Sequence, residues 1–266
     1  MITILKIVLI ITLTNNVYAQ YGPYEGCGHS VTNPSPQGWV AMVYRKDPTD
    51  DKKFVDNKCL ASIIKDNWLV GAASCLTLKD DQYLIKIPNN DTKGPFFVEK
   101  IYKSKEYNPT LGAGYDLALI KLKNGLQLRL PGNTKIMSAI CLSDYGIESS
   151  VTIGTKCQLN SYDTSRKLTP ETIEVKADID CENLYPRYKE GYMFCGDKSV
   201  NWLNSGAPIA CKDSRHQDGP FFLSAMASWG RVDKVKADVY TKLYGKHYIS
   251  WIQKTIEEDE SHALNL

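Results

Sequence analysis

The sequence predicts an all-β protein with one helix at its C-terminal end. Short runs rich in β-branched and aromatic residues recur between Gly, Pro, Asn and Asp, a spacing typical of a β-sandwich or β-barrel. A helical period occurs within residues 245–258, whose apolar side chains fall on one face: Tyr248, Ile249, Ile252 and Ile256. The eight cysteines are an even number, which in an exported chain predicts disulfides.

The first element is a predicted secretory signal peptide, residues 1–19. It carries one cation, Lys6, then a run of Ile, Leu and Val, and ends at Ala19, after which we expect cleavage. No later stretch reaches the ~20 apolar residues that a transmembrane helix needs. We therefore expect residues 20–266 to be secreted and extracellular, with no membrane contact.

The expected strands follow from residue 39 onward, each bounded by turn-forming residues. The runs are 39–44, 61–64, 68–72, 83–87, 117–122, 174–179, 221–228 and 239–243. The Pro- and Gly-containing stretch 124–133 is the expected linker between two β units. The acidic tail after Glu258 is expected to fray.

Charge and cysteine spacing exclude several functions. The net charge of +2 comes from scattered Lys and Arg, which argues against a nucleic-acid partner. Zinc competes with disulfides for the cysteines, but C-x-x-C spacing is absent and the four histidines are isolated: His29, His216, His247 and His262. We expect no metal and no cofactor. Asn90 begins the glycosylation sequon Asn-Asp-Thr.

Two segments resemble the catalytic motifs of trypsin-like serine proteases. Residues 203–208 read LNSGAP where that family reads GDSGGP, and residues 69–75 end in AASC where it reads TAAHC. Further matches follow in family order, among them YDLALIKL, MFCGD, SWG and the terminal helix. The resemblance implies two six-stranded antiparallel β-barrels, at about 37–123 and 134–244, with the active site in the cleft between them.

The resemblance also implies the cysteine pairing. It pairs Cys59 with Cys75, Cys157 with Cys211 and Cys181 with Cys195, which leaves Cys27 for Cys141.

The resemblance places an incomplete catalytic triad in this chain. Ser205 falls on the nucleophile and Asp116 on the buried acid, but Ser74 stands where the general-base histidine belongs. A serine needs a neighbouring base to take its proton as it attacks. Loss of one triad member costs roughly 10⁶-fold in turnover in the measured example of another protease. The sequence therefore predicts binding rather than proteolysis.

Two further positions depart from the family's pattern. Leu203 replaces the glycine whose amide helps to form the oxyanion hole, and losing one such donor costs about 10² to 10³-fold. Asn204 replaces the aspartate that pairs with the new amino terminus of an activated protease. No Arg or Lys followed by Ile-Val lies between Ala19 and Trp39. Both partners of the activation ion pair are therefore missing.

The specificity pocket that the resemblance implies is also altered. Ser199 stands at its base, so no acid there would select Lys or Arg. Asp238 replaces a wall glycine, and its carboxylate would obstruct the pocket unless a shifted loop turned it outward. Ser228, Trp229 and Gly230 keep the edge that binds the substrate backbone.

The residues assigned to the catalytic site also have purely structural interpretations. Ser205 is either a nucleophile or a turn serine in Asn-Ser-Gly, and Asp116 is either a working carboxylate or a buried structural one. Each histidine is a surface or packing group, or a substitute base.

A framework similar to mite digestive proteases, combined with a replaced triad, resembles the scabies mite inactivated protease paralogues. That resemblance implies a secreted protein that binds host proteins, notably complement components, and so blunts host defence. The alternatives are a hydrolase with an unusual base and a decoy that captures protease inhibitors. The sequence gives neither the binding surface nor the oligomeric state.

Overall fold

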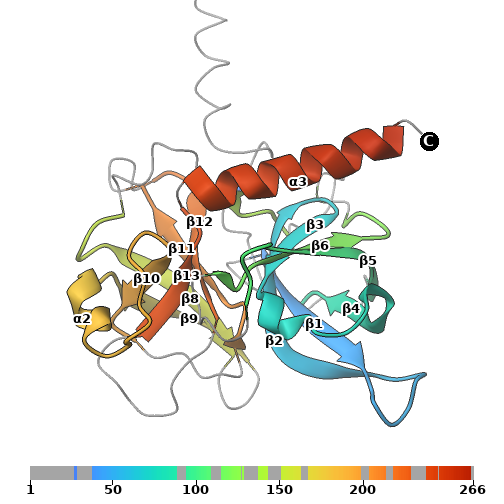
Figure 1. The fold of residues 1–266 in the computed structure, drawn as a ribbon. Helices are drawn as coiled ribbons and strands as arrows, with labels where there is room; N and C mark the ends of the chain where they lie inside the picture. The colour runs from blue at the N-terminus through green and yellow to red at the C-terminus, as the bar shows by residue number, and fades with distance from the viewer. Residues whose placement is uncertain are drawn as a thin grey trace, which may run out of the picture.

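Two β-sheets lie side by side with a long helix across one side of both (Figure 1). The computed structural model describes residues 27–28, 38–88, 94–108, 115–126, 128, 137–142, 151–162, 167–198, 204–213, 218–228, 238–244 and 246–264. Within them, no helix is long and apolar enough to cross a membrane. No group of three or more His, Cys, Asp or Glu side chains in this part of the chain could hold a metal ion.

The first sheet is a closed barrel in the strand order β1-β2-β3-β6-β5-β4, and every pairing is antiparallel. In β1, the buried Ala41 and Val43 alternate with the partly exposed Met42 and Tyr44, as a strand with one face on a core requires. The strands are β1 (Val40–Lys46), β2 (Phe54–Lys65), β3 (Trp68–Gly71), β4 (Tyr83–Lys86), β5 (Phe96–Lys103) and β6 (Ala118–Leu122).

The second sheet runs in the order β10-β13-β12-β11-β8-β9, with antiparallel pairs. A bridge between Val175, which follows β9, and Gly196, at the end of β10, joins the two ends of this order into a barrel. A short seventh strand, β7, pairs in parallel with β12. The strands are β7 (Cys141–Leu142), β8 (Lys156–Tyr162), β9 (Leu168–Glu174), β10 (Met193–Gly196), β11 (Pro208–Lys212), β12 (Phe221–Ala227) and β13 (Asp238–Lys242).

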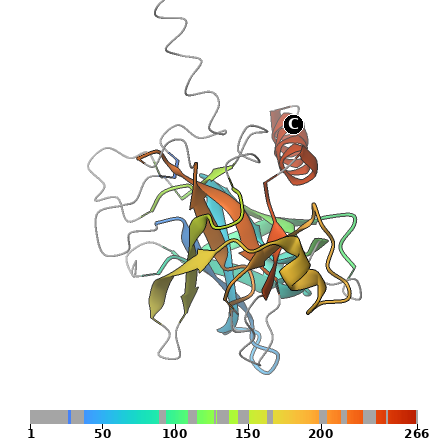
Figure 2. The same ribbon diagram turned by 90° about the vertical axis from the view of Figure 1, so that its left-hand side faces the viewer.

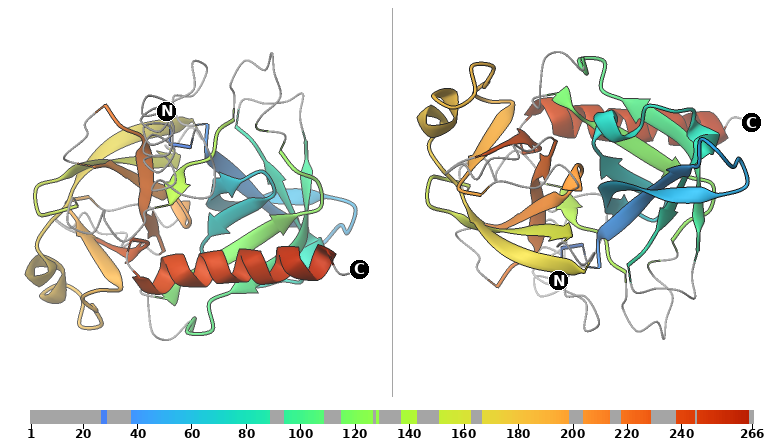
Figure 3. Two further views of the ribbon diagram at one scale, coloured as in Figure 1. Left: turned by 90° about the horizontal axis from the view of Figure 1, so that it is seen from above. Right: turned by 90° about the horizontal axis from the view of Figure 1, so that it is seen from below.

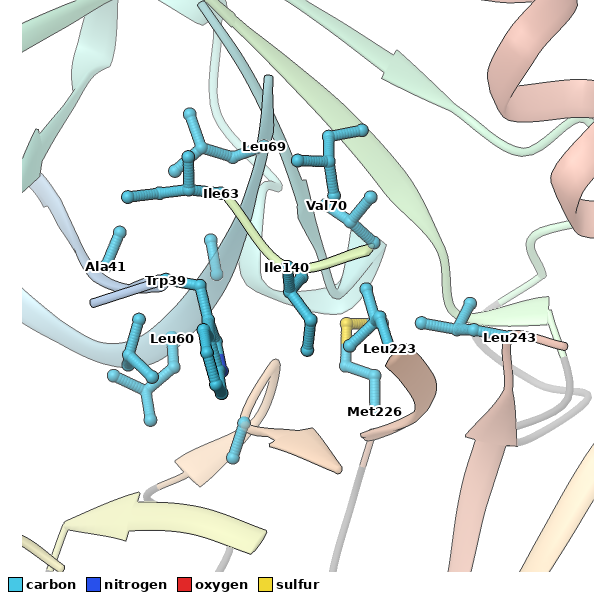
Figure 4. Close-up of a cluster of buried hydrophobic side chains, with 14 of the residues drawn as sticks. Trp39, Ala41, Leu60, Ile63, Leu69, Val70, Ile140, Leu223, Met226 and Leu243 are labelled. Carbon is cyan, nitrogen blue, oxygen red and sulfur yellow. The ribbon is translucent and has the colours of Figure 1, made fainter. Parts of the chain in front are cut away.

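The two barrels share one hydrophobic core. Figure 4 shows Trp39, Leu60 and Ile140 on the side of the first barrel, with Ile140 beside Leu223 and Met226 of β12. All five side chains are buried. The predicted fold class, two six-stranded barrels and a C-terminal helix, is confirmed, and β7 is an addition to it.

The terminal helix, α3 (Lys246–Leu264), is longer than predicted. It continues past Glu258, and the expected fraying of the tail is wrong because the acidic end of the helix is held by the first barrel. Asp259 accepts a hydrogen bond from Tyr102 and forms an ion pair with Lys121, whose nitrogen lies 2.6 Å away. Lys65 reaches Glu260 at 2.6 Å. Seen from above, α3 therefore spans both barrels (Figure 3).

One predicted strand is wrong. Only Glu174 of the run 174–179 lies in a strand, and the chain then turns into the short helix α2 (Asp178–Glu182), whose first turn carries Asp178 and Asp180. Acidic side chains are favoured in the first turn of a helix. The helix projects from the second barrel, away from the first (Figures 1 and 2). Six strands were not predicted: β5, β7, β8, β9, β10 and β11.

The four disulfides are the pairs that the resemblance implied. Two of the disulfides join residues of the second barrel and α2, and one joins residues of the first barrel. The fourth, Cys27–Cys141, links the start of the described chain to β7. The pairs are Cys27–Cys141, Cys59–Cys75, Cys157–Cys211 and Cys181–Cys195. The predicted linker, 124–133, is described only at 124–126 and 128.

Candidate functional site

The site forms where the ends of four strands meet. Ser74 lies in the 3-10 turn Ala73–Cys75 just after β3, and Asp116 lies just before β6. Because β3 and β6 are paired, with Gly71 opposite Ala118, these two residues become neighbours. Ser228 follows β12, whose pairing with β11 brings it beside the turn that contains Ser205.

That turn also contacts the first barrel. Ser205 forms a bridge with Cys59, and its carbonyl oxygen accepts a hydrogen bond of 2.8 Å from the amide of Leu60 in β2. The four polar residues therefore gather at the boundary between the two barrels.

Asp116 is the centre of the hydrogen-bond network. It is buried, with 2 % of its surface exposed. Its Oδ1 accepts from the amide of Ser74 at 2.7 Å, and its Oδ2 accepts from the hydroxyls of Ser74, also at 2.7 Å, and of Ser228. Ser74 itself is exposed, although its hydroxyl contacts the buried acid.

Burial raises the pKa of Asp116 above its usual range, although hydrogen bonds from Ser228 and Ser74 lower it in part. A carboxyl group with a raised pKa binds more protons in the folded than in the unfolded state between the two pKa values. It therefore reduces stability as pH rises through that window.

Asp116→Asn should consequently gain stability relative to the unchanged protein as pH rises from about 4 towards 7, because the unfolded carboxyl ionises near 3.9 and the folded one at a higher pH. Denaturant unfolding at each pH, with disulfides intact, measures the difference. A difference independent of pH would show that Asp116 does not titrate in this window.

The hydroxyl of Ser205 points to a neutral acceptor. In the described part of the chain its hydrogen-bond partner is the backbone carbonyl oxygen of Ser228. A carbonyl oxygen orients the hydroxyl but cannot take its proton. The Ser74 hydroxyl thus donates to Asp116, and the Ser205 hydroxyl donates to the backbone of Ser228.

Asn204 holds the turn to the second barrel. It is 2 % exposed, and its amide makes two bonds to the backbone of one residue, Tyr162, at the end of β8. The amide of Tyr162 donates to Oδ1 at 2.8 Å, and Nδ2 donates to the carbonyl oxygen of Tyr162 at 3.1 Å. A side chain with both an acceptor and a donor fits this pair, and a carboxylate would face the carbonyl oxygen without a proton to give.

Gly206 completes the turn with a positive φ of 85°. A Cβ atom at this position would lie 1.9 Å from the carbonyl oxygen of Leu60. Glycine is therefore required both by the backbone conformation and by the close approach of the first barrel.

A cavity of about 550 Å³ reaches Ser74, Asp116 and Ser228. Its other lining residues come largely from the segment between α2 and β10. They are Tyr107, Tyr185, Pro186, Arg187, Tyr188, Met193 and Val239. Neither His247 nor His262 is among them. The ring of His247 stacks on Tyr192, and His262 contacts the carbonyl oxygen of Glu258 one turn earlier in α3.

Asp238 is buried in β13. Its Oδ1 accepts hydrogen bonds from the hydroxyl of Tyr185 at 2.7 Å and from the amide of Val239 at 2.8 Å. Of the residues assigned to the pocket that Asp238 was predicted to obstruct, Ser228 lines the cavity at Asp116, and the others lie outside the described ranges.

Several predicted site residues lie outside the described part of the chain. They are the oxyanion position Leu203, the pocket positions Ser199, Trp229 and Gly230, the sequon residue Asn90, and His29 and His216.

The tyrosines of the cavity were not predicted from the sequence. Tyr107, Tyr185 and Tyr188 stand in loops without a local pattern that distinguishes them from the chain's other tyrosines. The partner of Asn204 was also not predicted, since a backbone contact across 42 positions leaves no local signal.

Comparison with known proteins covers both barrels and the site. The family model described as "Trypsin" matches residues 27–252. The chain is 27% identical to anionic trypsin of Bos taurus over 219 residues, which is 74% of this chain and 79% of that protein. It is 29% identical to trypsin-4 of Rattus norvegicus over 222 residues, which is 76% of this chain and 81% of that protein.

Proposed function

The chain belongs to the trypsin family, and we propose that it is a secreted binding protein built on that family's fold rather than a working protease. One observation carries the proposal. The hydroxyl of Ser74 occupies a hydrogen-bonding position on Asp116, at 2.7 Å, where the family resemblance expects an imidazole. A hydroxyl of ordinary pKa cannot accept the proton of Ser205 at neutral pH.

The environment of Ser205 supports the same proposal. Its hydroxyl donates to the carbonyl oxygen of Ser228, so the proton of the assigned nucleophile has no base beside it in the described residues. Asp116 keeps its hydrogen bonds with serine partners, in the role of a structural carboxylate.

The contacts of Asn204 support the proposal that this protein needs no activating cleavage. Its neutral amide is satisfied by the backbone of Tyr162, so the turn is held in place without a charged amino terminus. Leu203, assigned to the oxyanion hole, and Ser199, assigned to the base of the pocket, are further sequence departures from an active protease.

We expect no hydrolysis of peptide or ester substrates, with turnover at least about 10⁶-fold below that of an active family member. Incubation with a fluorescent fluorophosphonate, which labels activated serines, measures this, with Ser205→Ala as the matched control. Labelling that disappears in Ser205→Ala would establish the alternative, a hydrolase with an unusual base. Ser74→His alone should also give no turnover, since the proposed defects at Leu203 and Asn204 remain.

The proposed partners are host proteins, with complement components first among them. The support is the resemblance to the scabies mite inactivated protease paralogues, whose implied role is to blunt host defence. The four disulfides and the family are typical of secreted proteins, and we propose that residues 1–19 direct export.

Affinity capture from host serum with the secreted, disulfide-bonded protein tests the partner. A defined plasma protein should be recovered, and complement lysis should fall when the protein is added. Ser205→Ala should leave both unchanged, because interface energy is concentrated in a few surface anchors rather than in a remnant site. If a bulky residue at Gly230 alone abolishes capture from a folded protein, the cleft is the binding site and the inhibitor decoy is the better function.

A further inference from the structure

The cavity above Asp116 has the size and composition of a small-molecule site. Its volume of about 550 Å³ falls within the range of ligand pockets, roughly 300–1,000 Å³. Three tyrosines, Tyr107, Tyr185 and Tyr188, are among the residues that line it. Ligand pockets combine such apolar walls with a few polar groups that orient the ligand.

The polar end of the cavity carries a buried carboxylate that no cation of the described residues pairs with. Asp116 is 2 % exposed yet lines the cavity. Its donors are neutral groups of Ser74 and Ser228, and the ion pairs of the described residues do not include it. A buried charge without a counter-charge is unfavourable, and a bound cation relieves it.

Ser74 provides a contact for that cation. Its hydroxyl donates to Asp116 while the residue is exposed, so its oxygen keeps lone pairs that face away from the acid. An ammonium group can donate to this oxygen and lie next to the carboxylate without displacing the existing hydrogen bonds.

The cavity wall favours a cation over a neutral ligand. The faces of tyrosine rings attract cations. Burial, and then the charge of Asp116, raise the pKa of Tyr107, so its hydroxyl stays protonated and the ring stays neutral. Arg187 also lines the cavity, but it is exposed, and solvent and salt screen its repulsion more than they screen the attraction of a buried carboxylate.

We propose that this cavity binds a small organic cation with an aromatic ring, its ammonium group beside Ser74 and Asp116 and its ring among the tyrosines. This site is independent of the protein partner proposed above, and neither result decides the other.

The test compares phenethylammonium with 2-phenylethanol, which has the same shape and a neutral hydroxyl in place of the ammonium. Titration of the full secreted protein at pH 7, followed by calorimetry or NMR, should give a dissociation constant about tenfold lower or more for the cation. Asp116→Asn should abolish this preference, while Asp81→Asn, which makes the same change at an exposed position, should keep it.

Ser74→Leu provides a second variant, which keeps the carboxyl group of Asp116 but removes the hydroxyl that donates to it. It fills the space next to Asp116 from an exposed position, so both probes should lose binding. Equal affinity for the two probes, a preference that survives Asp116→Asn, or binding unaffected by Ser74→Leu would each overturn the proposal.

Discussion

Gly206→Ala should destabilise the protein by roughly 3 kcal/mol or more, the size expected when a backbone clash adds to an unfavourable φ. The added Cβ atom would lie 1.9 Å from the carbonyl oxygen of Leu60, a distance at which the two barrels must move apart. The amide of Leu60 and the carbonyl of Ser205 would then lose their 2.8 Å hydrogen bond. Thermal or denaturant unfolding with intact disulfides measures the loss.

Gly191→Ala is the matched control for this change. Gly191 has nearly the same φ, 83°, but its Cβ would meet nothing within 4 Å. Gly191→Ala should therefore lower the free energy of unfolding by only about 1 kcal/mol, the cost of placing a non-glycine residue at a positive φ. Equal losses for the two variants would mean that the approach of Leu60 adds no constraint and that the barrels adjust without cost.

Asn204→Asp should destabilise the protein by about 2–4 kcal/mol at pH 7, although the two side chains have the same shape. The amide of Tyr162 would still have an acceptor, but the second carboxylate oxygen would face the carbonyl oxygen of Tyr162 where Nδ2 now donates at 3.1 Å. Burial and this repulsion would raise the pKa of the new carboxyl group.

The pH dependence of that loss has a definite sign. A folded-state pKa above the unfolded value means that the folded protein binds the proton more tightly, so stability falls as pH rises through this interval. Below it, the protonated carboxyl can donate to Tyr162, and the loss should shrink. Unfolding at pH 4 and pH 7 checks this, with the exposed Asn183→Asp as control. A loss of equal size at both pH values would contradict a buried, titrating carboxyl.

The sequence predicted the strands that carry their own apolar pattern. The run 68–72 corresponds to β3, which is wholly buried, and the run 117–122 to its partner β6. It did not predict β9, whose residues Pro170, Glu171 and Thr172 are exposed and carry no apolar alternation. The strand is specified by its full-length pairing with β8 rather than by its own composition.

Within the site, too, local motifs could be predicted from the sequence, whereas contacts that depend on strand pairing could not. Motif resemblance singled out Ser74, Asp116 and Ser205, which the fold brings to one place. It could not predict that Ser205 would donate to the Ser228 carbonyl, because that contact depends on the pairing of β11 with β12. Nor could it predict where α3 ends, since its last turns depend on side chains of the first barrel.

These last contacts of α3 affect how the protein can fold during synthesis. Lys65 and Glu260 are 195 positions apart in the chain. The ribosome has made the whole second barrel before Glu260 emerges, so the first barrel must remain without these contacts throughout that time. Closing so large a loop carries an entropic penalty before the ion pairs offset it. Docking of the helix is therefore a late event, and a chain that stops before residue 259 leaves Tyr102 without its acidic partner and, among the described residues, leaves Lys121 with the ion pair to Glu99 alone.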